Sequence, residues 1–239
     1  MNTYFQAYGE RAFSLNNHTQ IAGRYAIQRD AEKNIVKDVI DKVDLKSTDK
    51  LLEIGCGTGN LLIPMSFLVS HCVGIDHPNC LNKFTQRTSV DNITLFGGDF
   101  FTLPNTDLGM FDKIIIYSVL HCLPNEQSVI DFVDKALAIL APGGLMLIGD
   151  IPNQDTKQRF LNSKEGQAFS VDWAKKMADS TVSEVPFETG IKSTEFNDEK
   201  LFSLVRRIRN QGAQAYIMPQ PSNLPFGYTR EDVVIRKFA

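Results

Sequence analysis

The sequence predicts an α/β fold in which a mostly parallel sheet is covered by helices on both faces. Three observations support this prediction. Short apolar runs alternate with segments whose apolar residues recur at helical spacing. A glycine-rich loop follows the first apolar run and opens a helix. The last two apolar runs have no helical segment between them, so they should pair antiparallel.

The first two thirds of the chain contain the regular alternation. Strands are expected over residues 50–55, 72–76, 93–99, 111–119 and 145–151. Helices with one apolar face are expected over residues 27–43, 61–70, 79–87 and 124–140. Pro64 is compatible with the second of these helices only in its first turn, where its missing N–H costs nothing.

The alternation then stops. Residues 152–196 contain only short helical pieces, and an interruption of this length is typical of a lid or a binding insertion. Helical spacing returns between Leu201 and Ile208, and the final strands are expected over 215–218 and 232–238. Residues 1–26 are aromatic and polar without clear periodicity.

Composition excludes several classes of protein. The 239 residues carry 25 basic and 28 acidic side chains, a net charge of −3, which does not favour a nucleic-acid partner. The longest apolar stretches are far shorter than the roughly 20 residues that span a bilayer. The four cysteines form no Cys-x-x-Cys pair, and no histidines lie at zinc spacing. We therefore expect a cytoplasmic, metal-independent protein with no nucleic-acid or membrane partner; the sequence does not set its oligomeric state.

The most informative segment is the glycine loop at residues 51–60. Glycines at 55, 57 and 59 allow a sharp turn and a close approach by a ligand, although such glycines also occur for packing alone. A dinucleotide fingerprint places its third glycine where this chain has Asn60. Glu53, at the end of the strand, suits a ligand with cationic or hydroxyl groups better than a pyrophosphate. The spacing therefore argues against a dehydrogenase.

Two further acids follow the next two strands. Asp76 is placed to accept hydrogen bonds from both hydroxyls of a ribose, or simply to cap the following helix. Asp99 can accept a hydrogen bond from an adenine amino group. Phe100 offers a face for stacking or belongs to the core. All three acids fall at carboxyl ends of parallel strands, where open α/β sheets bind ligands.

Together these motifs resemble those of class I S-adenosylmethionine-dependent methyltransferases over roughly residues 45–151. The resemblance rests on segments 53–59, 73–76, 98–100, 111–116 and 140–144. It implies seven strands in the order 3-2-1-4-5-7-6 with the seventh antiparallel, and S-adenosyl-L-methionine as cofactor. The glycine loop would hold the methionine end, Asp76 the ribose and Asp99 the adenine side. The expected cofactor-binding residues are Glu53, Gly55, Cys56, Gly57, Gly59, Asp76, His77, Asp99, Phe100 and Tyr117.

Catalytic residues are harder to predict, because the cofactor carries the intrinsic reactivity. His121 follows the fourth strand and is the candidate general base; alternatively, it is structural. In similar enzymes the N-terminal segment covers the cofactor, which places Tyr25, with Arg29, near the methionine carboxylate or the methyl group; alternatively, the aromatic residues only anchor the segment. We expect one domain over 1–239, with a lid at 1–30 and a substrate cap at 152–196.

The acceptor is predicted only as a class. Residues 117–120 lack the Asn/Asp-Pro-Pro-aromatic tetrapeptide of enzymes that methylate amino groups of nucleobases or glutamine. We therefore expect a small-molecule acceptor, with oxygen as the methylated atom, such as a bacterial surface-glycan or secondary-metabolite precursor. An RNA or protein methyltransferase and a catalytically inactive cofactor-binding module remain alternatives.

Overall fold

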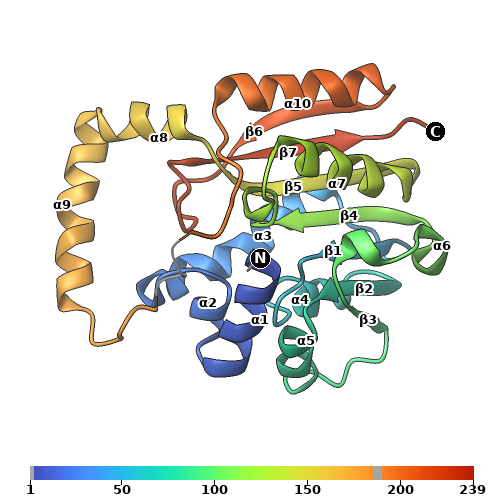
Figure 1. The fold of residues 1–239 in the computed structure, drawn as a ribbon, viewed down its shortest axis with the longest axis horizontal. Helices are drawn as coiled ribbons and strands as arrows, with labels where there is room; N and C mark the ends of the chain where they lie inside the picture. The colour runs from blue at the N-terminus through green and yellow to red at the C-terminus, as the bar shows by residue number, and fades with distance from the viewer. Residues whose placement is uncertain (1–2, 186–189) are drawn as a thin grey trace.

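The computed structural model describes residues 3–185 and 190–239. Its centre is a seven-stranded sheet with the order β3-β2-β1-β4-β5-β7-β6 (Figure 1). The strands are β1 Lys50–Ile54, β2 His71–Asp76, β3 Ile93–Gly97, β4 Phe111–Tyr117, β5 Leu140–Pro152, β6 Gln214–Pro219 and β7 Arg230–Arg236. The first five strands pair in parallel, whereas β7 lies between β5 and β6 and is antiparallel to both. The predicted fold class and strand order are confirmed.

Helices cover both faces of the sheet. They are α1 Tyr4–Ser14, α2 His18–Ile21, α3 Arg29–Val43, α4 Leu62–Ser66, α5 Pro78–Thr85, α6 Asn105–Leu108, α7 Glu126–Ala138, α8 Gln154–Leu161, α9 Lys164–Asp179 and α10 Asp198–Asn210. Apolar side chains of α3, α4 and α5 form the core on one face, and those of α7 and α10 form it on the other. No helix within the described residues has the length and apolar character needed to cross a bilayer.

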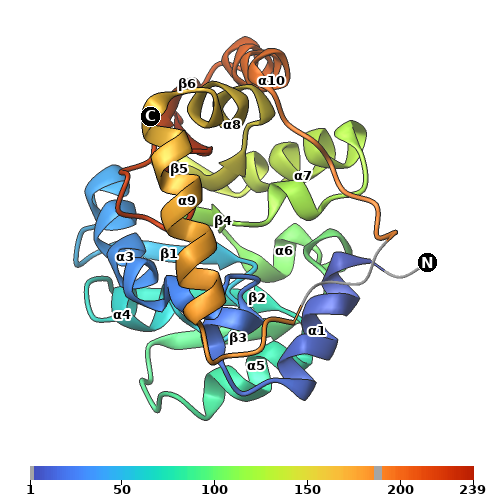
Figure 2. The same ribbon diagram turned by 90° about the vertical axis from the view of Figure 1, so that its left-hand side faces the viewer.

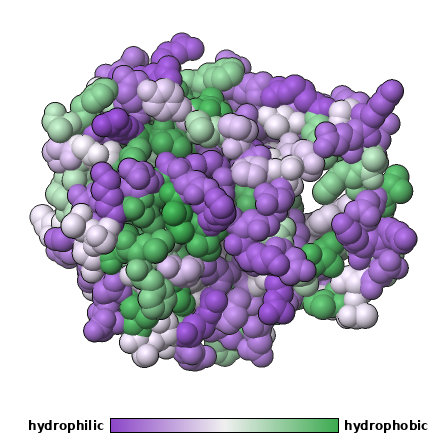
Figure 3. All heavy atoms as spheres, turned by 180° about the vertical axis from the view of Figure 1, so that it is seen from behind, coloured by the Kyte–Doolittle hydropathy of each residue, from purple (hydrophilic) through white to green (hydrophobic). Residues whose placement is uncertain are grey.

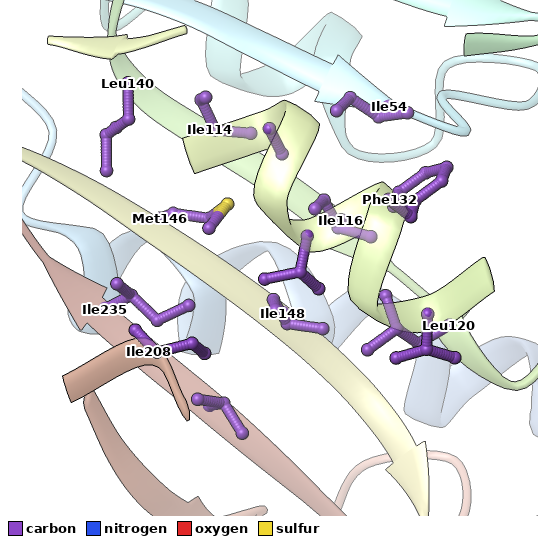
Figure 4. Close-up of a cluster of buried hydrophobic side chains, with 14 of the residues drawn as sticks. Ile54, Ile114, Ile116, Leu120, Phe132, Leu140, Met146, Ile148, Ile208 and Ile235 are labelled. Atoms are coloured by element: carbon purple, nitrogen blue, oxygen red, sulfur yellow. The ribbon is translucent and has the colours of Figure 1, made fainter. Parts of the chain in front are cut away.

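Strand β4 shows how the sequence produces this two-sided core. Successive side chains of a strand point to opposite faces, so a run buried on both sides is apolar throughout. Ile114 and Ile116 face the helices α7 and α10, whereas Ile115 packs on the opposite side with α3. Figure 4 shows Ile114 and Ile116 among the side chains of neighbouring strands and helices.

Two boundaries differ from the predictions by four residues or more. Helix α4 ends at Ser66 rather than near residue 70, because the chain turns there and the Ser70 amide donates to the Asp49 carbonyl before β2 begins. Strand β5 begins at Leu140 rather than Leu145 and passes through Gly143 and Gly144 with a register shift against β4. Glycine tolerates this irregular backbone, and Gly143 has a φ of 78°.

The two segments without clear periodicity are helical. Residues 4–21 form α1 and α2, and residues 154–179 form α8 and α9, which are longer than the short pieces expected there. We call α8 and α9 the arm. It projects beyond the carboxyl ends of the parallel strands in Figure 1, and α9 crosses in front of that edge in Figure 2. In Figure 3, seen from behind, the arm forms the lobe on the right.

Both ends of the arm contact the body of the molecule. Near its start, Asp155 accepts from the Asp198 amide at 3.1 Å, and at the start of α9 the Tyr228 hydroxyl donates to Glu165 at 3.0 Å. After its end, the Arg11 guanidinium donates to the Val185 carbonyl at 2.6 Å, and the Gln20 amide donates to the Ser183 carbonyl at 2.9 Å. The arm therefore connects the C-terminal half of the chain to helices α1 and α2.

Candidate functional site: a cofactor cavity and its neighbour

The glycine loop turns between β1 and α4 in a conformation that depends on glycine. Gly55 has a φ of +82°, and a Cβ there would lie 2.4 Å from Val119 Cγ2. Gly57 has a φ of +54°, but a Cβ there would meet no atom within 4 Å, because the position faces open space. The loop thus presents bare backbone to a cavity at the carboxyl edge of the sheet.

Asp76, at the end of β2, fixes this loop. Its carboxylate accepts hydrogen bonds from the Gly57 amide at 2.7 Å and the His77 amide at 2.6 Å. Burial raises the pKa of Asp76, and these two hydrogen bonds oppose that shift. Each carboxylate oxygen has a further lone pair, so Asp76 can still accept hydrogen bonds from a ligand.

Glu53 is the unusual group of the site. The residue is buried in the floor of the cavity, and its Oε2 has no hydrogen-bond partner among the described residues. Burial, followed by the nearby charge of Asp76, raises the pKa of Glu53 to about 8. A hydrogen bond from the Leu62 backbone opposes this shift. An unpartnered oxygen on a buried carboxyl is costly, and a cationic or hydroxyl group in the cavity would relieve that cost.

Eight of the ten predicted cofactor-binding residues line one cavity of about 400 Å³. They are Glu53, Gly55, Cys56, Gly57, Asp76, Asp99, Phe100 and Tyr117. Two predicted residues, Gly59 and His77, do not line it. A Cβ on Gly59 would collide with Ile63 and Phe84, so that glycine permits close packing. The His77 ring is covered by α1, where Gly9 has no side chain to obstruct it.

The residues after β3 each combine a place in the cavity lining with a structural role. Asp99 lines the cavity and also caps the 3-10 turn at Phe100–Thr102, where it accepts a hydrogen bond from the Phe101 amide at 2.9 Å. Phe100 lines the cavity and also packs edge-on against Phe132, with 5.0 Å between the ring centroids. The same residue can therefore pack in the core and line the cavity.

Helices α1 and α2 and the chain after them form a wall of this cavity. They contribute Tyr4, Phe5, Tyr8, Ile21, Ala22 and Arg24 to its lining. Arg24 is buried, pairs with Glu32 at 3.1 Å and donates to the Ser118 hydroxyl at 3.1 Å. Arg24 was not predicted, and Arg29 was expected near the cofactor instead, because the segment around Arg24 has no periodicity that would show which of its side chains point inward.

The two predicted catalytic residues lie outside this cavity lining. Tyr25 lines a second cavity of about 520 Å³, and its ring packs edge-on against Trp173 with 5.3 Å between centroids. His121 lines neither cavity. Its Nδ1 is buried without a hydrogen-bond partner among the described residues, and burial, together with Arg230, lowers its pKa to about 4. The ring is therefore neutral at physiological pH.

Comparisons with known proteins agree with this geometry. A family model described as a methyltransferase domain matches residues 45–200. An uncharacterized methyltransferase of Oceanobacillus iheyensis is 25% identical over 146 residues, which are 61% of this chain and 63% of that protein. A demethylmenaquinone methyltransferase of Staphylococcus saprophyticus is 28% identical over 137 residues, covering 53% of this chain and 57% of that protein. The matches thus span about three fifths of these relatives' lengths.

A solved structure extends the likeness to the whole fold. The N-methyltransferase NodS from Bradyrhizobium japonicum, in complex with S-adenosylhomocysteine, superposes with a TM-score of 0.61 over 99% of each chain at 15% identity. At that identity the likeness concerns the fold alone. The family model, by contrast, matches more than half of the sequence and therefore shows the family. The chain therefore belongs to the methyltransferase domain family.

Proposed function

We propose that this protein is an S-adenosylmethionine-dependent methyltransferase that acts on a small-molecule acceptor, with oxygen as the methylated atom. The observation that carries the proposal is the cavity at the carboxyl edge of the sheet. There the glycine loop meets the side chains of Glu53, Asp76 and Asp99. This arrangement suits a ligand that joins an amino acid to a nucleoside.

The residues present fit that cofactor. The bare backbone at Gly57 leaves room for the methionine end, and the unpartnered Glu53 oxygen is suited to its ammonium group. Asp76 would accept from the ribose hydroxyls, and Asp99 and Phe100 would contact the adenine. When bound, S-adenosylmethionine supplies an activated methyl group on a sulfonium.

The chain's own contribution is alignment and exclusion of water. An oxygen lone pair of the acceptor would form the new bond to the methyl carbon that the cofactor supplies. The sulfur would keep the electron pair of the bond it loses, and the acceptor proton would leave to a base or to solvent. We propose Tyr25, which lines the neighbouring cavity, as an acceptor-side residue, and we keep His121 as the candidate base. An acceptor that binds already ionised needs no base.

The helices that wall the cofactor cavity support the proposal of a small acceptor. Helices α1 and α2 wall the cofactor cavity, and they are bound to the chain after the arm through Arg11 and Gln20. We infer that a wall held in this way favours an acceptor small enough to enter beside it. We propose that residues 1–30 act as the lid and residues 152–196 as the substrate cap. The name of the demethylmenaquinone relative also denotes a small-molecule acceptor, for that protein.

Calorimetric titration with S-adenosylhomocysteine, NAD and ATP in parallel tests the cofactor assignment. We expect saturable binding of S-adenosylhomocysteine alone. A screen of bacterial surface-glycan and secondary-metabolite precursors with methyl-labelled cofactor then tests the acceptor class. Absence of S-adenosylhomocysteine binding at millimolar concentrations would overturn the proposal. Methylation confined to RNA or protein fractions would overturn its small-molecule part.

A further inference from the structure

Helix α9 of the arm is almost entirely exposed, although it carries large aromatic side chains. Of the 16 residues of α9, all within the described chain, only Gly166 is buried. Phe169 and Trp173 nevertheless lie on the side of α9 that lines the second cavity. Exposed apolar surface of this kind commonly marks a binding site. In Figure 3 apolar side chains show where the lobe faces the body of the molecule.

The second cavity is lined by aromatic rings from four parts of the chain. Phe160 and Tyr228 stack with 4.3 Å between centroids and 6° between ring planes, and Phe169 and Trp173 are nearly parallel at 18°. The full aromatic lining is Tyr25, Phe160, Phe169, Trp173, Phe226 and Tyr228. Its volume of about 520 Å³ lies within the usual range for small-molecule sites. Rings arranged in this way favour a flat, apolar ligand.

The charges of the cavity are one-sided. Among the described residues, its lining includes the cations Lys157 and Arg230 and no carboxylate. Arg230 Nε lies 3.7 Å from Asp150, and the guanidinium sits over the Phe226 ring at 4.8 Å. Its Nη1, however, is buried without a hydrogen-bond partner in the described part of the chain. A buried, unpartnered guanidinium nitrogen is suited to an anionic oxygen of a ligand.

The second cavity adjoins the cofactor cavity. Arg24 lines the first cavity, and the next residue, Tyr25, lines the second. A polar chain also joins them, since Arg230 faces Asp150 and Asp150 accepts from the Ser118 hydroxyl, which lines the first cavity. A molecule in the second cavity would therefore lie beside the cofactor.

We propose that the second cavity is the acceptor site and that it binds flat aromatic acids. The aromatic rings contact the body of the acceptor, and Arg230 binds its carboxylate or another anionic group. This inference rests on the proposed methyltransferase function and adds to it the chemical class of the substrate.

Trp173 provides a direct test, because it is the only tryptophan of the chain and lines the cavity. The intact protein is titrated with 2-naphthoate, which is flat and anionic, and with 2-naphthamide, its neutral analogue. Decanoate serves as an acid without a ring. Tryptophan emission and calorimetry report binding, with and without S-adenosylhomocysteine. We expect 2-naphthoate to bind about tenfold more tightly than 2-naphthamide, as one charge-assisted hydrogen bond would provide, and decanoate to bind more weakly than either.

Matched variants test separately the charge of Arg230 and the ring contact of Phe169. Arg230→Gln should weaken 2-naphthoate by about tenfold and leave 2-naphthamide unchanged. Arg230→Lys should restore part of the loss, and Arg206→Gln, on an exposed face of α10, should have no effect. Phe169→Ala should weaken both naphthalene probes, whereas Val171→Ala, on the same helix but 74% exposed and outside the cavity, should weaken neither. Thermal melting confirms that each variant is folded.

Three results would overturn the inference: no saturable binding of 2-naphthoate, equal affinity for 2-naphthoate and 2-naphthamide, or an equal effect of Arg230→Gln and Arg206→Gln. The comparison of probes in the unmodified protein holds even if a variant fails to fold. Failure of 2-naphthoate with intact S-adenosylhomocysteine binding refutes this inference and leaves the proposed function standing. Failure of S-adenosylhomocysteine refutes the proposed function whether or not the second cavity binds the acid.

Discussion

The hydroxyl of Ser118 donates a hydrogen bond to the carboxylate of Asp150, and both residues have a φ of 61° although neither is glycine. Ser118 directly follows β4, and Asp150 lies near the end of β5. Such left-handed conformations cost about 1–3 kcal/mol each and persist only where surrounding contacts enforce them. Here Arg24 holds Ser118, and Asp232 accepts from the Asp150 amide at 2.8 Å. These contacts therefore fix the polar chain of Arg230, Asp150 and Ser118 that joins the two cavities.

Two substitutions of Ser118 distinguish the cost of its backbone strain from the contribution of its hydrogen bonds to stability. Ser118→Ala and Ser118→Gly both remove the hydroxyl, but only glycine adopts a φ of 61° without a steric penalty. We expect Ser118→Gly to be more stable than Ser118→Ala by about 1 kcal/mol in urea unfolding. Equal stability of the two variants would show that the backbone at this position is not strained.

Cofactor binding should release a proton from Glu53. With a pKa of about 8, Glu53 is mostly protonated at pH 7, and an ammonium group beside it would favour the ionised form. Affinity for S-adenosylhomocysteine should therefore rise between pH 6 and pH 8, by up to about tenfold per pH unit. Calorimetry in buffers of different ionisation enthalpy measures the released proton directly. Glu53→Gln should abolish both effects, and affinity that does not change with pH would contradict the pairing.

The same residue should reduce the stability of the free protein above acidic pH. The folded-state pKa is raised, so the penalty is absent below the unfolded value of about 4.3 and grows as pH rises toward 8. Glu53→Gln should therefore raise the melting temperature at pH 8 and change it little at pH 4. A destabilised variant at pH 8 would mean that the contacts of the carboxylate in the folded chain, such as its hydrogen bond from the Leu62 backbone, outweigh the cost of its burial.

The bare backbone at Gly57 can be tested against another glycine with positive φ. Gly57 and Gly109 both have positive φ, and a Cβ at either would meet no atom within 4 Å. Alanine should cost about 1 kcal/mol of stability at Gly57 and about 1–3 kcal/mol at Gly109, whose ψ of −155° belongs to a conformation essentially confined to glycine. Only Gly57→Ala should weaken S-adenosylhomocysteine binding in calorimetry, because only Gly57 lines the cofactor cavity. Equal binding by the two variants would place the ligand away from the loop.

His121 is tested through the pH dependence of turnover. If it acts as general base, His121→Gln should lower turnover by about 10²-fold while the affinity for the cofactor holds. Since its pKa is about 4, activity should fall only as pH drops through that value and stay level between pH 6 and pH 8. A loss below threefold would assign His121 a structural role, consistent with its carbonyl accepting from the Thr194 amide at 3.1 Å.

Much of the fold was predictable because its strands are buried on both faces. Continuous apolar runs such as Ile114–Tyr117 leave little alternative to a central strand. Helix α1 was not predicted, since its burial is achieved through Ala7, Gly9 and Ala12, small residues that give no apolar pattern. Helix α9 was underestimated for a related reason, because almost none of its side chains enter the core.

The site residues, like the helices and strands, were predictable only in part. Residues at the ends of strands, such as Glu53, Asp76 and Asp99, were predictable because the sheet brings those ends to one edge. Arg24 and the aromatic lining of the second cavity were not, because they meet only through contacts between distant segments. Tyr25 and Tyr228 illustrate this, since about 200 residues separate two rings that line one cavity.

The position of β7 has a consequence for assembly of the chain. It is the last strand in sequence, yet it inserts between β5 and β6 and supplies the buried carboxylate of Asp232, which accepts from Lys42, Gln220 and the Asp150 amide. Until this strand arrives, β5 presents an open edge and β6 has no neighbour in the sheet. During synthesis on the ribosome, therefore, the five parallel strands can associate first, but the hydrogen bonds that join Ser118, Asp150 and Asp232 are complete only when Arg230–Arg236 has emerged.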